Sequence, residues 1–155
     1  MNVRHDMVTV FVVRPDERGT SHEVLYMRRA PTSYMGGTWA VVRGGVNAGE
    51  PYLEAALREL REETGLRPRE LYRLGSIESF YTLAHDTLWH SVPFCALVSR
   101  SDEVRLNREH DDHRWIHRDH AVGDSMWASE RHVLSDVFHD ILDEGVAKPY
   151  LRVDM

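Results

Sequence analysis

The sequence predicts an α/β domain in which helices pack on a mixed β-sheet. Short runs rich in β-branched and aromatic residues, typical of buried strands, recur along most of the chain. A charged, helix-length stretch interrupts them, and a second stretch with apolar residues at helical spacing follows near the end. Strands before and between two helices favour helices layered on a sheet, and 155 residues suit a single domain spanning residues 1–155.

Six segments are predicted to form strands. The first is the β-branched run VTVFVV at residues 8–13, which reads as a buried strand. The turn sequence PDERG separates it from VLYM at residues 24–27. The others are a short strand at 39–42, two longer runs at 74–81 and 89–98 that suggest a hairpin, and a short strand at 114–117.

Two helices are predicted between and after these strands. The first covers residues 51–64, because Pro51 suits a first helical turn and Gly65 is the expected residue just past a helix end. The glycine-rich run RGGVNAGE before it is predicted to be a loop. The second helix covers residues 127–142, and a polar loop is expected at residues 100–109.

Composition and charge argue against several classes of partner. A net charge of −6 disfavours loose electrostatic binding of nucleic acid, which requires a basic surface. No apolar run approaches the ~20 residues that span a bilayer, and the N-terminus lacks the apolar core of a signal peptide. The one cysteine, Cys95, cannot form a disulfide within the chain, so we expect a cytoplasmic protein without nucleic-acid or membrane partners.

The first predicted helix carries an unusual number of carboxylates. At about 100° per residue, Leu53, Leu57 and Leu60 form one stripe that we expect to be buried. On an adjacent arc, Glu59, Glu62 and Glu63 are neighbours and are expected to share one space. The repulsion between like charges destabilises such a cluster unless a cation between them offsets it. Clustered carboxylate oxygens suit Mg²⁺ or Mn²⁺. A solvated acidic face, paired with Arg58 and Arg61, is the alternative.

The loop before the helix favours the metal site. Gly44 is followed by five residues and Glu50, then by seven residues and the run RELREETGL, residues 58–66. This spacing resembles the Nudix box at every defining position. The strand order and the final helix are also similar to that family, so the resemblance extends over most of the chain.

The resemblance implies both a fold and a chemistry. It implies an α/β/α sandwich with a mixed sheet and a loop–helix–loop catalytic motif, which hydrolyses a nucleoside diphosphate linked to another moiety with Mg²⁺ or Mn²⁺. By position, Glu59, Glu62 and Glu63 are implied as metal ligands and catalytic residues, with the Gly44 carbonyl as a further oxygen. Arg58 and Glu50 are implied to hold the loop and the glutamates in place.

Other candidate site residues lie outside the helix. Glu109 is expected to add a carboxylate as metal ligand or general base, with Glu103 as the alternative. Arg29 at the end of the second strand and Arg43, which stands where the family often has glycine, are candidate substrate contacts. For Arg43 a place on the surface is the alternative. Tyr81 is a candidate to stack on a base, and two tryptophans, Trp89 and Trp127, could also stack or pack in the core. The run HDDH at residues 110–113 is expected to be solvated rather than to bind metal.

The substrate is a small-molecule nucleotide by the same resemblance. The chain is most similar to pyrophosphohydrolases of dATP-like or dihydroneopterin triphosphates, on the runs TWAVVRGGVNAGE and WASERHVLSDVF. The product would be a monophosphate and pyrophosphate. Dinucleoside polyphosphate hydrolases, ADP-ribose hydrolases and Nudix domains that bind nucleotides without hydrolysis remain alternatives. The sequence leaves the oligomeric state open.

Overall fold

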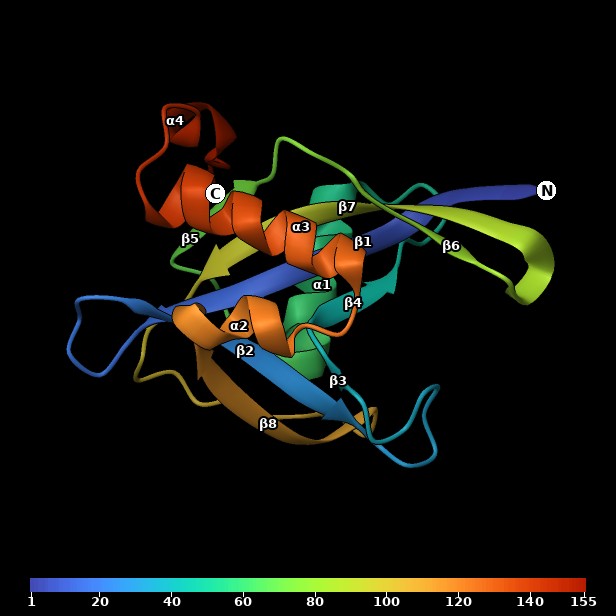
Figure 1. Cartoon of the computed structure of the whole chain (residues 1–155), viewed down its shortest axis with the longest axis horizontal. Coiled ribbons are helices and arrows are strands. Elements are labelled where there is room, and N and C mark those ends of the chain that lie inside the picture. Colours follow the sequence, from blue (N-terminus) through green and yellow to red (C-terminus); the bar gives the residue numbers. More distant parts are fainter.

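The computed structural model describes all residues, 1–155, as helices layered on both faces of a mixed sheet (Figure 1). The helix α1 lies behind the sheet, and α2 and α3 lie in front of it. The strands are β1 (Asn2–Pro15), β2 (His22–Arg29), β3 (Trp39–Ala40), β4 (Val42–Gly45), β5 (Glu70–Arg73), β6 (Glu78–Thr82), β7 (Thr87–Leu97) and β8 (His110–His117). The helical segments are α1 (Tyr52–Thr64), η1 (Ala84–Asp86), α2 (Arg118–Asp124), α3 (Ala128–Asp136), η2 (Val137–Leu142) and α4 (Lys148–Leu151).

The long strand β1 is the centre of the sheet. It runs parallel to β7 from Asn2 opposite Thr87 to Val13 opposite Leu97, with a shift in register between Arg4 and Met7. Its other edge pairs antiparallel with β4 and then with β2. Strand β8 and the short β3 pair with β2, while β5 and β6 pair with β7. The sheet is therefore mixed, as predicted.

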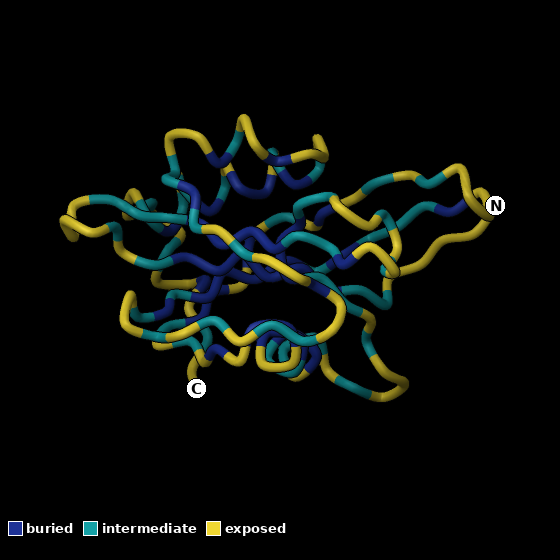
Figure 2. Tube along the Cα trace, turned by 90° about the horizontal axis from the view of Figure 1, so that it is seen from below, coloured by how far each residue is buried: buried dark blue, intermediate teal, exposed yellow.

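Two apolar cores, one on each face of the sheet, hold the layers together. One core joins alternate residues of the central strands to α2, α3 and η2. The other joins the opposite residues of the same strands to α1, through Ala55, Ala56 and Leu60. Figure 2 shows the buried segments as a band between the helical layers. Because side chains of a strand alternate between faces, the run VTVFVV serves both cores.

The glutamate-rich helix α1 forms nearly as predicted. Pro51 is its N-terminal flanking residue, and Gly65 ends it in the left-handed conformation, with φ 71° and an N–H donated to the Arg61 carbonyl at 2.9 Å. The expected buried stripe is wrong in part, because Leu53 and Leu57 are only half-buried and the tight contact with the sheet is made by two alanines. Small residues there let the helix approach the sheet closely, which carries the neighbouring glutamates inward.

The predicted strand at 74–81 is wrong in its first half. A strand β5 ends at Arg73, and β6 begins only at Glu78. Leu74 still donates its N–H to the Pro93 carbonyl at 3.1 Å, but Pro93 has no N–H to donate in return, so the ladder of β5 with β7 ends there. The hairpin of β6 with β7 is confirmed.

Three further boundaries differ from expectation. The loop predicted at RGGVNAGE begins as strand β4, because Gly44 and Gly45 pair with β1. The last strand is longer than predicted and starts at His110. The predicted helix 127–142 is α3 followed by the π-helical turn η2, and the short helices α2 and α4 were not predicted. The fold contains no helix with the length and apolar character to cross a bilayer.

Candidate active site

The carboxylates of α1 do not all face the same way. Glu59 and Glu63 are buried at the contact of α1 with the sheet, whereas the Glu62 side chain is 51% exposed. The expected common space therefore holds Glu59 and Glu63, with Glu62 at its rim. One helical turn separates Glu59 from Glu63, so both side chains leave the helix on the same side.

Arg58 joins the helix to the loop before it. Its guanidinium donates to both oxygens of Glu50, at 2.7 and 2.9 Å, and to the Gly45 carbonyl at 2.8 Å. It also donates to Glu59 at 2.8 Å and to Glu62 at 3.4 Å. The hydrogen bonds from Arg58, followed by the Asn47 N–H, lower the pKa of Glu50 to about 2. Arg58 and Glu50 thus fix the loop against the helix.

Gly44 is a glycine because Glu59 occupies the space beside it. A Cβ at this position would overlap the Glu59 carboxylate, so any other residue would displace that side chain. Gly44 pairs with Val8 as an ordinary strand residue. A glycine is therefore required here because a side chain would not fit, and not because the backbone adopts an unusual angle. Strand β4 therefore passes directly over the acidic end of α1.

Glu63 is buried with few partners. One oxygen accepts the backbone N–H of Arg43 at 3.2 Å, and no other hydrogen bond to the carboxylate is found. Burial, followed by the negative charges of Glu59 and Glu109, raises the pKa of Glu63 well above its usual value. Burial also raises the pKa of Glu59, although Arg58 opposes the shift. Such carboxylates are destabilising as anions unless a cation joins them.

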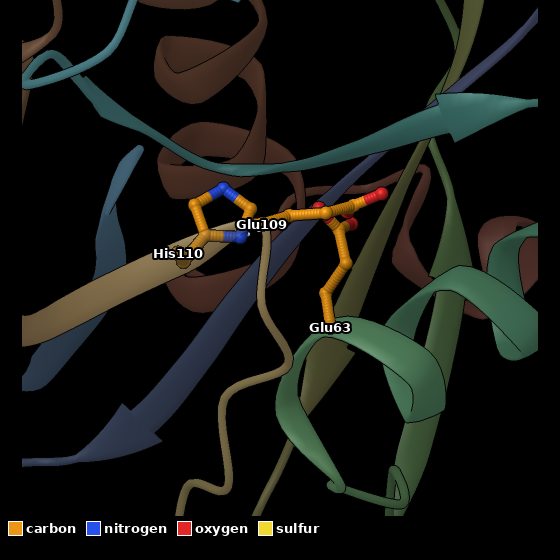
Figure 3. A group of neighbouring side chains, drawn as sticks. All are labelled: Glu63, Glu109 and His110. Carbon is orange, nitrogen blue, oxygen red and sulfur yellow. Dashed lines mark ion pairs between the residues drawn. The ribbon is translucent and has the colours of Figure 1, made fainter. Parts of the chain in front are cut away.

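The start of β8 adds two residues to this pair. Glu109, His110 and Glu63 each offer a donor atom within 4.8 Å of one another. Figure 3 shows the Glu109 and His110 side chains, from β8 and the loop before it, beside Glu63, which rises from α1. Burial lowers the pKa of His110. We call Glu59, Glu63, Glu109 and His110 the acidic cleft.

Other candidates from the same segment are not part of the acidic cleft. Glu103 is 78% exposed and pairs with Arg105. Of the run HDDH, Asp111 accepts from Arg28 at 2.7 Å and Asp112 accepts from the His113 N–H. Only His110 turns inward, because it is the one buried residue of the four. The sequence pattern did not predict that His110 is buried, because only the register of β8 against β2 distinguishes it from its solvated neighbours.

The alternative expectation for Arg43, a place on the surface, is wrong, because its side chain is largely buried. Its guanidinium makes two hydrogen bonds to the fully buried Glu78, at 2.9 and 3.0 Å. Glu78 also accepts from Thr9 at 2.7 Å and from Ser129 at 2.9 Å. We call these residues the Glu78 network. It lies on the neighbouring part of the sheet and was not predicted, because its members come from four distant segments.

Two cavities meet beside the acidic cleft. The larger, about 1490 Å³, is lined by apolar and aromatic side chains of β6, β7 and the start of α3, including Phe80, Tyr81, Trp89 and Trp127. The smaller, about 290 Å³, is lined by Glu63, Glu109 and His110. Arg29, Tyr34 and Arg43 line both. A ligand can therefore pass from an aromatic site to an acidic one along two arginines.

The three predicted substrate contacts, Arg29, Arg43 and Tyr81, differ in how many of their polar groups are already hydrogen-bonded within the protein. The Arg29 Nε atom is buried and has no hydrogen-bond partner. Burial, followed by the charge of Arg43, lowers the pKa of Arg29. Tyr81 is exposed at the rim of the larger cavity, where its hydroxyl donates to Asp86 at 3.0 Å. The Arg29 Nε–H has no partner, whereas the Arg43 guanidinium is already held by two hydrogen bonds to Glu78.

The donor set of the acidic cleft fits a divalent cation. It consists of carboxylates that repel one another and of an imidazole nitrogen, His110 Nδ1, that is buried without a partner. Glu59 and Glu63 could hold the ion from α1, and Glu109 from the segment before β8. A cation would relieve the repulsion and satisfy the nitrogen together.

Known proteins resemble this chain in sequence. The NUDIX domain family model matches residues 3–137. An octanoyltransferase of Myxococcus xanthus is 36% identical over 117 residues, which are 71% of this chain but only 30% of that protein. An RNA pyrophosphohydrolase of Shewanella piezotolerans is 33% identical over 127 residues, 69% of each chain. An asymmetrical bis(5'-nucleosyl)-tetraphosphatase of Sus scrofa is 33% identical over 103 residues, 63% of this chain and 68% of that protein.

Solved structures resemble it in fold. An Ap4A hydrolase of C. elegans, determined as a binary complex, superposes with a TM-score of 0.73 over 93% of this chain and 99% of that chain. Its sequence identity is 22%, so the likeness concerns the fold. The mixed sheet with helices on both faces is thus the architecture of that protein as well.

Proposed function

Because this chain belongs to the Nudix family, whose members include pyrophosphohydrolases of nucleotide-linked substrates, we propose that it hydrolyses a nucleoside triphosphate to a monophosphate and pyrophosphate. The proposal includes Mg²⁺ or Mn²⁺ as cofactor. It also includes a cytoplasmic location, because the one cysteine, Cys95, is a free and buried thiol, as is usual in a reducing compartment. It treats residues 1–155 as one catalytic domain.

The observation that carries the proposal is the junction of the two cavities. An aromatic cavity suits a nucleoside, because bases stack on aromatic rings. An acidic cavity suits a polyphosphate only when a cation is present, and the carboxylates of Glu63 and Glu109 are there to hold one. The phosphates would then lie between the two, past Arg29 and Arg43.

Each site residue has a distinct role in the proposal. Glu59, Glu63 and Glu109 hold the cation, while Glu62 at the rim and the Gly44 carbonyl complete the oxygen donors. Arg58 positions Glu59 and Glu62, and Glu50 positions Arg58. The bound cation would neutralise charge on the phosphate oxygens and favour deprotonation of a water. Arg29, which lines both cavities, would bind a phosphate oxygen through its guanidinium, and the rings beside the larger cavity would exclude water from the nucleoside.

Arg43 acts differently from its expected role. Its guanidinium is held by two hydrogen bonds to Glu78, so it contributes positive charge to the junction from a fixed position. Its backbone N–H positions Glu63. Arg43 therefore lines the larger cavity with its side chain and contacts the acidic cleft with its backbone N–H.

A dinucleoside polyphosphate is the second candidate substrate. The larger cavity, about 1490 Å³, exceeds the ~300–1,000 Å³ usual for small-ligand sites, and several aromatic rings line it. The Sus scrofa relative, named as a bis(5'-nucleosyl)-tetraphosphatase, supports the same candidate. ADP-ribose is a third substrate to test.

The experiment is a hydrolysis panel with product identification. Purified protein is incubated with ATP, dATP, Ap4A, ADP-ribose and a 5'-triphosphorylated RNA, each with Mg²⁺, with Mn²⁺ and with EDTA. We expect metal-dependent release of pyrophosphate from a triphosphate. Preferred cleavage of Ap4A or of the RNA would replace the substrate assignment, and turnover that persists in EDTA would contradict the metal role.

A further inference from the structure

We propose that His110 Nδ1 is a direct ligand of the divalent cation, beside the carboxylates of Glu63 and Glu109, and that this nitrogen makes the site favour Mn²⁺ over Mg²⁺. The inference rests on the cation site of the proposed function. It goes beyond that site in adding a nitrogen donor to a set of oxygens.

The His110 Nδ1 atom needs a partner that the protein does not provide. The imidazole is 6% exposed, and Nδ1 is buried without any hydrogen bond. Buried polar atoms of this kind are uncommon in folded proteins. The Oε1 atom of Glu63 lies 3.7 Å from Nδ1, which is too far for a hydrogen bond.

The spacing of the donors suits an ion between them. An ion with bonds of about 2.1 Å places neighbouring donors ~3.0 Å apart and opposite donors ~4.2 Å apart. The separation of 3.7 Å between Nδ1 and Glu63 Oε1 is wider than that of neighbouring donors, so a small rotation of the side chains would bring both atoms onto one ion. All three donor atoms lie within 4.8 Å of one another, and Glu109 is exposed enough to adjust. Figure 3 shows a ring nitrogen of His110 directed toward the glutamates.

The backbone fixes this orientation before any ion binds. His110 is the first residue of β8 and pairs with Arg29 of β2. The carbonyl of Glu109 accepts the Ala30 N–H at 2.9 Å and the Ser33 hydroxyl at 3.1 Å. Residues 109 and 110 are therefore anchored to the end of β2, and the imidazole enters the acidic cleft from a rigid strand. Preorganisation of this kind is typical of ligand residues.

A nitrogen donor changes which ion the site prefers. Oxygen ligands alone suit Mg²⁺, Ca²⁺ and Mn²⁺, whereas imidazole suits the transition metals. Mg²⁺ also gives up its water ligands reluctantly. A mixed set of carboxylates and one imidazole should thus retain Mn²⁺ more tightly than Mg²⁺.

The test detects the nitrogen by spectroscopy. Protein loaded with Mn²⁺ is studied by pulsed EPR, in which a directly bound imidazole gives ¹⁴N modulation of the electron spin echo. The affinities of Mn²⁺ and Mg²⁺ are measured by titration. The variant is His110→Asn, which keeps a polar group near the Nδ1 position. The control is His113→Asn, three residues along the same strand and outside the acidic cleft.

The wild type and His113→Asn should both give ¹⁴N modulation, and His110→Asn should lose it. Loss of the ligand should weaken Mn²⁺ binding by about tenfold or more and Mg²⁺ binding by less than about threefold. Bound Mn²⁺ without ¹⁴N modulation in the wild type would overturn the inference and leave the proposed function in place. Nitrogen-coordinated Mn²⁺ in a protein that cleaves no nucleotide would support the inference and contradict the proposed function.

Discussion

Glu63 and Glu78 are both deeply buried, with side chains 3% and 0% exposed, yet their surroundings are opposite. Glu78 accepts four hydrogen bonds, two of them from the Arg43 guanidinium. Glu63 accepts one, from a backbone N–H, and faces other carboxylates. Arg43 touches both, since its side chain binds Glu78 and its N–H binds Glu63.

The difference separates two uses of a buried charge. Glu78 has its cation and its donors already, so it contributes to holding β4, β6 and the start of α3 together. Glu63 lacks a cation, which leaves the acidic cleft less stable by itself and ready for a metal ion. Under the proposed function, hydrogen-bond satisfaction rather than burial separates the metal-binding glutamate from the structural one.

The largest effect is expected from removing the Glu63 charge. Glu63→Gln keeps the shape of the side chain but should reduce kcat by ~10³-fold, because charge stabilisation by a bound metal is worth several kcal/mol and 1.36 kcal/mol is tenfold. The thermal midpoint in EDTA should stay the same or rise, since repulsion is relieved. Glu54→Gln, at an exposed position of the same helix, is the matched control. Near-normal turnover by a folded Glu63→Gln protein would contradict a metal-binding role for Glu63 and leave it as a structural residue like Glu78.

Glu78→Gln should act on stability instead. It leaves the Arg43 guanidinium near a neutral amide, and breaking a buried ion pair from one side costs about 3 kcal/mol. Urea denaturation should therefore show a lower midpoint with an unchanged slope. If the variant kept wild-type stability but lost activity, Glu78 would belong with the functional glutamates.

Glu109→Gln tests which loop carboxylate belongs to the acidic cleft. Because Glu109 lies with Glu63 and His110, kcat should fall by ~10²-fold, corresponding to the loss of one charge at the metal. Glu103→Gln should turn over normally, since Glu103 pairs with Arg105 on the surface. The reverse ranking in steady-state assays would return Glu109 to the solvated loop.

The smallest effect concerns pH and the metal-free protein. Burial raises the pKa of Glu63 above its unfolded value, so the folded state keeps a proton that the unfolded state loses first. Stability in EDTA should fall as pH rises from about 4.5 to the raised pKa and level off above it. Glu63→Gln should flatten this slope. Thermal midpoints measured between pH 4.5 and 8 that run parallel for the two proteins would contradict the assignment of the shift to Glu63.

Local sequence predicts the parts of the site that lie on one helix. The spacing from Gly44 to Gly65 predicts α1 and its ends, because capping and helical phase are properties of neighbouring residues. It also predicts Glu59 and Glu63 on one side. It places Ala56 only at the edge of the buried stripe and misses the burial of Ala55, since how closely a helix approaches a sheet depends on the sheet.

Contacts between distant segments are what the sequence does not reveal. Glu78 meets Arg43, Thr9 and Ser129 only after three strands and a helix are assembled. His110 lies in a run of polar residues that all look solvated, and only its register against Arg29 turns it inward. The break between β5 and β6 did have a sequence signal, which was Pro93 on the partner strand.

The parallel pairing of β1 with β7 has a consequence for synthesis on the ribosome. Asn2 pairs with Thr87 and Val13 with Leu97, so β1 has a partner that is translated much later. At ~5–20 residues per second, the delay is roughly 4 to 17 s. During that time the apolar, β-prone run VTVFVV has its partners β2 and β4 on one edge but none on the other, and an open edge of this kind promotes aggregation. Chaperone contact with the nascent chain should therefore concentrate at its first strand and end when β7 emerges.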